Sequence, residues 1–242
     1  MDLPASNEVH LWWAFPDVPW DKEVQERQFA VLSKAEQEQQ RRFVFERDRR
    51  QYLVSHALLR DVLSRYAPVP PGNWHFEVNA YGRPHISNPV EWQKLRFNLS
   101  HTEGRAVVAV AWDFDVGIDV ESIRNQPDLT EIANRYFSPL EVAQLQRTPG
   151  RFFDFWTLKE AYIKARGLGL AIPLKSFSFI LAEPDDPRIA FHEGCLDQPE
   201  RWQFALLPRE GYQVALAAAM DARPQIVERE LAPRAERPKA SN

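Results

Sequence analysis

The chain has 242 residues, 44% of them hydrophobic and 26% charged, and a formal net charge of −4. This balance is typical of a soluble globular protein, and the acidic charge argues against a dedicated binder of nucleic acid or anionic membranes. The single cysteine, Cys195, excludes an intramolecular disulfide and fits a reducing, cytoplasmic setting. The N-terminus lacks the basic and apolar stretches of a signal peptide, and no apolar run approaches the roughly 20 residues of a membrane-spanning helix.

The first half of the chain is expected to hold one long helix and several strands. Ser33 and Glu36 have the spacing of a capping box, and apolar residues then recur at helical period. Glycines such as Gly82 and Gly104 divide the stretches that follow into paired strands. The predicted elements are a strand at 8–15, a helix over 33–66, a hairpin over 75–86 and a two-stranded ribbon over 96–112.

The second half repeats this order after a linking segment at 113–150. The recurrence predicts an α+β fold with two similar halves, 1–114 and 115–221, related by a pseudo-two-fold axis, and a cleft between such halves suits a ligand. The proline- and charge-rich tail, 222–242, is expected to be disordered. The predicted elements are a strand at 116–122, a polar turn at 124–128, a helix around 129–147, a helix over 151–170 closed by Gly167 and Gly169, a strand pair over 176–191 and a ribbon over 202–220.

Asp119 and Glu121 stand two residues apart in a predicted strand, so both carboxylates face the same side of it. Two carboxylates held this close repel each other unless a cation lies between them. Converging carboxylate oxygens suit Mg²⁺, with phosphate oxygens and waters completing its coordination shell. A half-buried strand with a solvated polar face has the same spacing, so the pair alone leaves both interpretations open.

Glu160 and Lys164 stand four residues apart on a predicted helix and share one face of it, with Trp156 one turn before. Such a pair is usually a surface ion pair that stabilises a helix by roughly 0.3–0.5 kcal/mol. Here the aromatic run at 152–156 precedes the pair, which indicates that this face is packed or lines a cleft.

Ser100 and His101 end a predicted strand at its turn, where a histidine can contact an anion and a serine can donate a hydrogen bond. A structural hydrogen bond is the more common role of such a histidine. The chain has no glycine-rich phosphate loop and no nucleophile elbow. An arginine cluster near the start of the long helix is either a solvated face or a phosphate-binding surface; its members are Arg41, Arg42, Arg47, Arg49 and Arg50.

Together, these segments resemble the Sfp-type 4′-phosphopantetheinyl transferases over about residues 10–220. Each motif alone is weak, but the ordered set at family-like spacing is specific. The motifs are R-F-V-F-E-R-D (42–48), Y-G-R-P (81–84), F-N-L-S-H (97–101), V-G-I-D-V-E (116–121), R-Y-F-S-P-L-E (135–141) and F-W-T-L-K-E-A-Y-I-K (155–164).

The resemblance implies a cytoplasmic monomer that moves the 4′-phosphopantetheine arm of coenzyme A (CoA) to a serine of an apo acyl or peptidyl carrier protein, releasing adenosine 3′,5′-bisphosphate. By position, Asp119, Glu121 and Glu160 would hold Mg²⁺ against the CoA pyrophosphate. Glu160 would also activate the carrier serine, and Lys164 would neutralise or protonate the leaving phosphate. The residues expected to contact CoA are Arg42, Gly82, Arg83, Asn98, Ser100, His101, Lys159 and Lys164.

One departure from the family pattern concerns the 3′-phosphate of CoA. Relatives often place basic residues one or two turns before the R-F motif, whereas this chain has Glu36 and Gln39 there. Arg42, or another arginine of the cluster, is expected to take over the contact.

Two other functions are considered beside transfer. A regulatory CoA- or nucleotide-binding protein without transferase activity would be expected to lack one of Asp119, Glu160 and Lys164, and this chain has all three. A metal-dependent phosphohydrolase would be expected to show a His/Asp cluster for two metals, whereas the six histidines are scattered.

Overall fold

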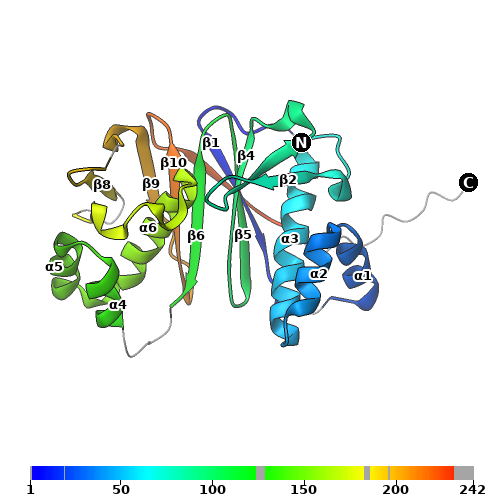
Figure 1. The fold of residues 1–242 in the computed structure, drawn as a ribbon, viewed down its shortest axis with the longest axis horizontal. Helices are drawn as coiled ribbons and strands as arrows, with labels where there is room; N and C mark the ends of the chain where they lie inside the picture. The colour runs from blue at the N-terminus through cyan, green and yellow to red at the C-terminus, as the bar shows by residue number, and fades with distance from the viewer. Residues whose placement is uncertain (1, 19, 124–128, 183–185, 196, 232–242) are drawn as a thin grey trace, which may run out of the picture.

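The computed structural model describes residues 2–18, 20–123, 129–182, 186–195 and 197–231. Two larger β-sheets stand at the centre, with the helices of the first half on one flank and those of the second half on the other (Figure 1). Among the described residues, no helix combines the length and apolar character needed to span a bilayer.

The first half agrees with the predicted strands but divides the predicted helix. The capping box at Ser33 and Glu36 forms, yet the helix expected over 33–66 is two helices, because the backbone of Phe43 and Phe45 is extended. α1 lacks a clear apolar stripe and was therefore missed by the sequence prediction. The elements are β1 (Glu8–Ala14), α1 (Lys22–Ala30), α2 (Lys34–Arg42), α3 (Glu46–Tyr66), β2 (His75–Val78), β3 (Pro84–Asn88), β4 (Leu95–Thr102) and β5 (Arg105–Trp112).

The second half repeats the order of helix, hairpin and ribbon, as predicted. The helix expected around 129–147 is again two helices, and a second capping box between Ser138 and Glu141 starts the latter one. Gly167 adopts the left-handed conformation that ends α6, and the polar turn at 124–128 lies outside the described residues. The elements are β6 (Val116–Ser122), α4 (Leu129–Tyr136), α5 (Pro139–Arg147), α6 (Phe152–Arg166), β7 (Phe177–Ile180), β8 (Arg188–Phe191), β9 (Trp202–Leu206), β10 (Tyr212–Ala219) and β11 (Gln225–Glu230).

The two larger sheets, ordered β11-β1-β5-β4 and β6-β10-β9, share one central hydrophobic core. Along β5, Val108 packs toward α3 while Val107 packs into the central core, as the two-residue period of a strand requires. The same alternation governs β6. Because Ile118 lies in the central core, Asp119 and Glu121 lie on the opposite face of β6, toward α6.

β4 and β6 meet where the two sheets adjoin. The backbone N–H of Ile118 donates to Asn98 Oδ1 at 2.8 Å, and the N–H of Val120 donates to Ser100 Oγ at 3.2 Å. Both pairs are 20 residues apart in sequence, so the strands run parallel along this seam. Side chains of the F-N-L-S-H motif thus join the two halves.

The expectation of a disordered tail from residue 222 is wrong for Gln225–Glu230, which form β11 parallel to β1. Ile226 of this strand packs against the central core. Trp13 Nε1 also donates to Glu228 Oε2 at 3.0 Å. Residues 232–242 lie outside the described part of the chain, and the division at 114/115 stays a prediction.

Truncation tests the contribution of β11. Deleting 222–242 should lower the free energy of unfolding by about 2–4 kcal/mol more than deleting only 232–242, because the longer deletion uncovers the β1 edge and the Ile226 contact. Urea unfolding of both truncated chains measures the difference. Equal stabilities would contradict a structural role for β11.

Candidate functional site

α6 packs directly on β6 at Gly117. A Cβ at this position would overlap the carbonyl oxygen of Ala161 and lie 2.5 Å from the backbone nitrogen of Ala165. Glycine lets the helix and the strand approach this closely, because it has no side chain to separate them. The helix face that carries Glu160 and Lys164 is thereby brought against the carboxylates of β6.

These groups line one hollow of about 340 Å³ between β4, β6 and α6. Lys164 Nζ donates to Asp119 Oδ1 at 2.6 Å and to Ser100 Oγ at 2.9 Å. Ser100 Oγ donates in turn to Asp119 Oδ1 at 3.0 Å. The structure therefore brings together most of the predicted site residues; the lining is Leu99, Ser100, His101, Asp119, Glu121, Trp156, Glu160 and Lys164.

The hollow between β4, β6 and α6, called the central hollow from here on, holds three carboxylates and one ammonium group. Burial and then the charge of Asp119 raise the pKa of Glu121 to about 6. The same two causes raise the pKa of Glu160, and Lys164 opposes the shift at both residues. Trp156 Nε1 donates to Glu121 Oε1 at 3.3 Å, which the sequence did not indicate. An additional cation would relieve the repulsion that raises both pKa values.

Asp119 Oδ2 provides a structural test of whether a metal ion fits. This atom is buried and accepts no hydrogen bond within the described part of the chain. A buried carboxylate oxygen without a donor is costly unless a cation meets it, and hard oxygen donors suit Mg²⁺. In the described ranges, no three His, Cys, Asp or Glu side chains form a ready-made metal cage. The donor set fits Mg²⁺, and the ligand assignment stays a prediction.

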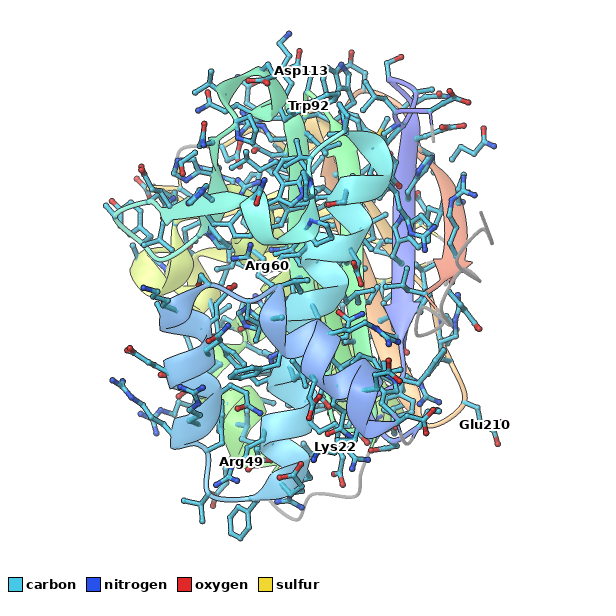
Figure 2. The ribbon with its side chains drawn as sticks, turned by 90° about the vertical axis from the view of Figure 1, so that its right-hand side faces the viewer. Lys22, Arg49, Arg60, Trp92, Asp113 and Glu210 are labelled. Atoms are coloured by element: carbon cyan, nitrogen blue, oxygen red, sulfur yellow. The ribbon has the colours of Figure 1, made fainter. Side chains whose placement is uncertain are left out.

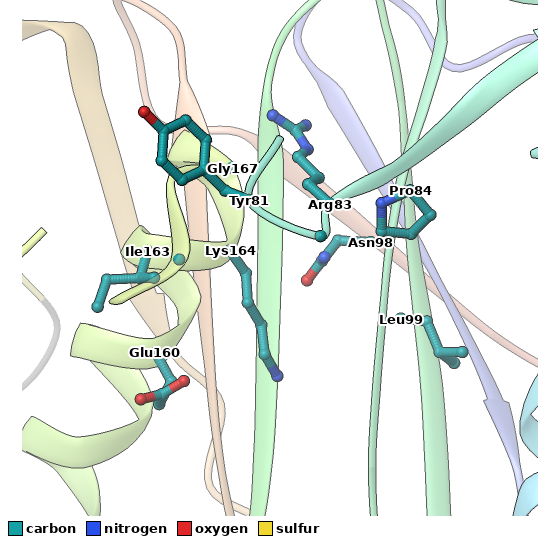
Figure 3. A pocket seen from close by; sticks show the side chains of 11 residues that line it. Tyr81, Arg83, Pro84, Asn98, Leu99, Glu160, Ile163, Lys164 and Gly167 are labelled. Atoms are coloured by element: carbon teal, nitrogen blue, oxygen red, sulfur yellow. The ribbon is translucent and has the colours of Figure 1, made fainter. Parts of the chain in front are cut away.

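Two further hollows adjoin the central one. The first, of about 290 Å³, lies between the β2–β3 turn and α6, where Tyr81, Arg83, Glu160 and Lys164 border it (Figure 3). The second, of about 330 Å³, lies between the start of α3 and the β4–β5 turn and includes His101. Lys164 borders the first and central hollows and His101 borders the second and central ones, so the three hollows are neighbours; together they are called the groove below.

His101 borders both the second hollow and the central hollow. Burial, followed by the charges of His56 and Lys164, lowers the pKa of its imidazole. At neutral pH the ring is therefore neutral and acts through hydrogen bonds.

Comparison with known proteins identifies the family. The model "4′-phosphopantetheinyl transferase, N-terminal" matches residues 18–113, and the model "4′-phosphopantetheinyl transferase superfamily" matches residues 115–217. The 4′-phosphopantetheinyl transferase HetI of Nostoc sp. is 37% identical over 69% of this chain and 71% of its own length. The chain belongs to the 4′-phosphopantetheinyl transferase superfamily. The 4′-phosphopantetheinyl transferase Sfp of Bacillus subtilis is 30% identical over 87% of this chain and 92% of its own length.

Arg83 of this transferase, expected to contact the nucleotide end of CoA, also connects the two halves. Its Nη1 donates to Asp115 Oδ1 at 3.0 Å and to the carbonyl oxygen of Ala165 at 2.7 Å. Asn79 Nδ2 donates to the carbonyl oxygen of Gly167 at 2.6 Å. The β2–β3 turn is thus fixed on the C-terminal end of α6, and the predicted Gly82 and Asn98 line the same hollow as Arg83.

Lys159, expected to contact CoA, lies outside the groove, and that assignment is wrong. Its side chain is 0% exposed, and Nζ lies 2.8 Å from Glu141 Oε2. Nζ also donates to the carbonyl oxygens of Leu174 and Phe177 at 2.7 and 2.9 Å. The reason is helix geometry: Lys159 is turned by about 100° from its neighbour Glu160, into the core between α5, α6 and β7.

Arg42 also lies apart from the predicted site. Its side chain is exposed at the last turn of α2 and borders none of the three hollows. Arg47, in the first turn of α3, borders the second hollow together with Gln51 and Tyr52. Arg47 and Gln51 are four residues apart, so the sequence alone indicates that they share one helix face. The extended backbone that separates α2 from α3 was not predicted.

Glu36, which departs from the family pattern, belongs to a partly buried ionic network. Arg60 Nη2 donates to Glu36 Oε2 at 2.6 Å, and His56 Nδ1 lies 3.1 Å from Glu36 Oε1. Arg60, labelled in Figure 2, extends from α3 and stacks on Phe76 of β2. Burial alone would raise the pKa of Glu36, but His56 and Arg60 outweigh it and hold the pKa at about 2. The Glu36 carboxylate is therefore ionised and engaged with the fold.

Gly117→Ala tests the close packing of α6 on β6. The added methyl group must displace helix backbone, so the free energy of unfolding should fall by about 2 kcal/mol or more. The control is Gly150→Ala, where the new Cβ has no neighbour within 4 Å and the expected change is about 0.5 kcal/mol or less. Urea unfolding measures both; similar losses would show that Gly117 is not sterically required.

Lys159→Met tests the buried pair. It leaves the Glu141 carboxylate buried without its ammonium partner, so stability should fall by about 3–5 kcal/mol. Adding Glu141→Leu removes the unpaired charge and should restore only part of the loss, because the backbone N–H groups of Ser138 and Phe179 then lose their acceptor. A double-mutant cycle from thermal unfolding measures the coupling, and full stability of Lys159→Met would contradict a structural role for this lysine.

Proposed function

We propose that this protein transfers the 4′-phosphopantetheine group of CoA to a serine of an apo acyl or peptidyl carrier protein, in a Mg²⁺-dependent reaction that releases adenosine 3′,5′-bisphosphate. The observation that carries the proposal is the meeting of Asp119, Glu121, Glu160 and Lys164 in one hollow. The chain is a member of the superfamily. Carboxylates that can hold a metal ion, together with a lysine, suit pyrophosphate cleavage because they neutralise the negative charge that develops on the leaving group.

Asp119, Glu121 and Glu160 would hold Mg²⁺, which supplies charge neutralisation on the pyrophosphate oxygens. The buried, unpartnered Asp119 Oδ2 and the raised pKa values of Glu121 and Glu160 support this assignment. Lys164 would stabilise the negative charge that develops on the leaving phosphate, since its ammonium group borders both the centre and the adjoining hollow.

Glu160 is the proposed base for the carrier serine. Its side chain borders both the central hollow and the first one, which would bring it beside a serine hydroxyl that enters there. As the serine oxygen bonds to the phosphorus that bears pantetheine, the P–O bond to the adenosine bisphosphate breaks. The hydroxyl proton passes to Glu160, and the electron pair leaves with the phosphate beside Lys164.

The remaining assignments concern the residues that contact CoA, and the oligomeric state, compartment and partners of the protein. Ser100 and His101 would contact the CoA phosphates, and Gly82, Arg83 and Asn98 would border the nucleotide. The protein would act as a monomer in the cytoplasm, with the carrier protein as its macromolecular partner and without nucleic acid or membrane partners.

Mass spectrometry of the carrier protein tests the function. Incubation of the transferase with CoA, Mg²⁺ and several apo carriers, acyl and peptidyl, should add one phosphopantetheine mass to at least one carrier, and EDTA should prevent it. CoA binding without any transfer would favour a regulatory CoA-binding protein, and neither binding nor transfer would refute the proposal.

Glu160→Gln tests the assigned base and ligand. Transfer should fall by about 100-fold or more, since both metal binding and proton acceptance are impaired. Circular dichroism and thermal unfolding should remain close to those of the wild type, because the change preserves shape. Glu200→Gln, at an exposed carboxylate of the same half, is the matched control and should leave transfer unchanged. Full activity of Glu160→Gln would refute the role.

A further inference from the structure

The first and second hollows, which lie beside the central hollow, differ in the cationic side chains that border them. The first is bordered by Arg83 and Lys164, and both are engaged by protein groups: Arg83 by Asp115 and a helix carbonyl, Lys164 by Asp119. Apolar and aromatic side chains such as Tyr81 supply much of the remaining lining. This hollow suits a flat, neutral base better than a second phosphate group.

The second hollow offers a guanidinium at its rim. The Arg47 side chain is 74% exposed, lies 3.4 Å from Asp48 Oδ1 and stacks on Phe45. An arginine in this position can present two parallel donors to a phosphate monoester. Thr102 and Gln51 border the same hollow and add neutral hydrogen-bonding groups. The hollow therefore has the donor set for one phosphate group.

The same hollow also carries a surplus of negative charge. Asp17 and Asp48 border it beside the single guanidinium of Arg47. A phosphate dianion bound there is attracted by Arg47 and repelled by both of these carboxylates. Because this rim is open to solvent, salt screens both effects, and the net attraction is small.

We propose that Arg47 is the residue that recognises the 3′-phosphate of CoA, and that the carboxylates around it keep the preference for CoA over 3′-dephospho-CoA low. The inference rests on the proposed function, because it takes CoA as the donor. The hollow adjoins the centre at His101, so a ribose phosphate can enter it while the pyrophosphate of the same nucleotide lies at the carboxylates. The expected preference is about two- to fivefold, the upper part of what an exposed ion pair contributes.

Titration calorimetry of CoA and 3′-dephospho-CoA, with Mg²⁺ and without a carrier protein, measures this preference as a ratio of two dissociation constants. In Arg47→Ala the ratio should fall to about one, because CoA binding weakens and dephospho-CoA binding does not. Arg47→Lys should keep part of the preference. In Asp48→Asn the ratio should rise by about two- to threefold, because a competing carboxylate is removed.

The matched control is Arg188→Ala. Arg188 is 75% exposed and paired with a nearby aspartate, Asp186, just as Arg47 is paired with Asp48, but it lies on β8 away from the groove. Its removal should leave the ratio unchanged. Arg42→Ala tests the rival arginine: a loss of preference there, with none in Arg47→Ala, would overturn the assignment.

Two other results would overturn the inference. A wild-type preference of about 100-fold or more would mean that a strong phosphate site exists and that the carboxylates do not limit it. Equal ratios in the wild type and Arg47→Ala would mean that this arginine does not recognise the phosphate.

The transfer assay separates this inference from the proposed function. If both donors bind with the expected ratios but neither yields a modified carrier, the proposed transfer fails and the role of Arg47 stands. If transfer occurs from both donors and Arg47→Ala has no selective effect, the function stands and the inference fails. Absence of binding by either nucleotide would refute both.

Discussion

The contact on which the site depends is the direct packing of α6 against β6 at Gly117. A side chain at this position would collide with the helix backbone, and its absence allows the helix to lie on the strand. The three carboxylates and Lys164 come together only because of this approach, since two of them lie on the strand and the others on the helix. Burial in this hollow, followed by the repulsion from Asp119, raises the pKa of Glu121 and Glu160, so the packing of the helix on the strand sets the charge properties of the site.

The seam between the halves uses the same side chains that border the groove. Asn98 and Ser100 accept backbone N–H groups of β6, and Arg83 reaches across to Asp115 and the end of α6. A ligand in the groove therefore contacts residues that already hold the two halves in register. Changes at these positions should affect stability and ligand binding together, unlike changes at Arg47, whose side chain is exposed at the rim.

Two adjacent charged residues of the 155–164 motif lie in different environments. Glu160 faces the groove, whereas Lys159 is fully buried and paired with Glu141. Successive residues of a helix differ by about 100° in direction, and residues four apart differ by only about 40°. Lys164 accordingly shares the face of Glu160, and Lys159 anchors α6 to α5 and β7.

The sequence by itself determined the repeated order of helix, hairpin and ribbon, the shared strand face of Asp119 and Glu121, and the shared helix face of Glu160 and Lys164, because these follow from the fixed periods of strands and helices. Tertiary structure alone decided the rest. In the tertiary structure Lys159 is buried, Arg42 lies outside the groove, and β11 pairs with the edge of β1. Helical phase gives the direction of a side chain only relative to its own helix; whether that direction meets solvent, a core or a ligand site depends on what packs against it. A polar tail segment can likewise form a strand when a strand that is distant in the sequence has an unpaired edge for backbone hydrogen bonds.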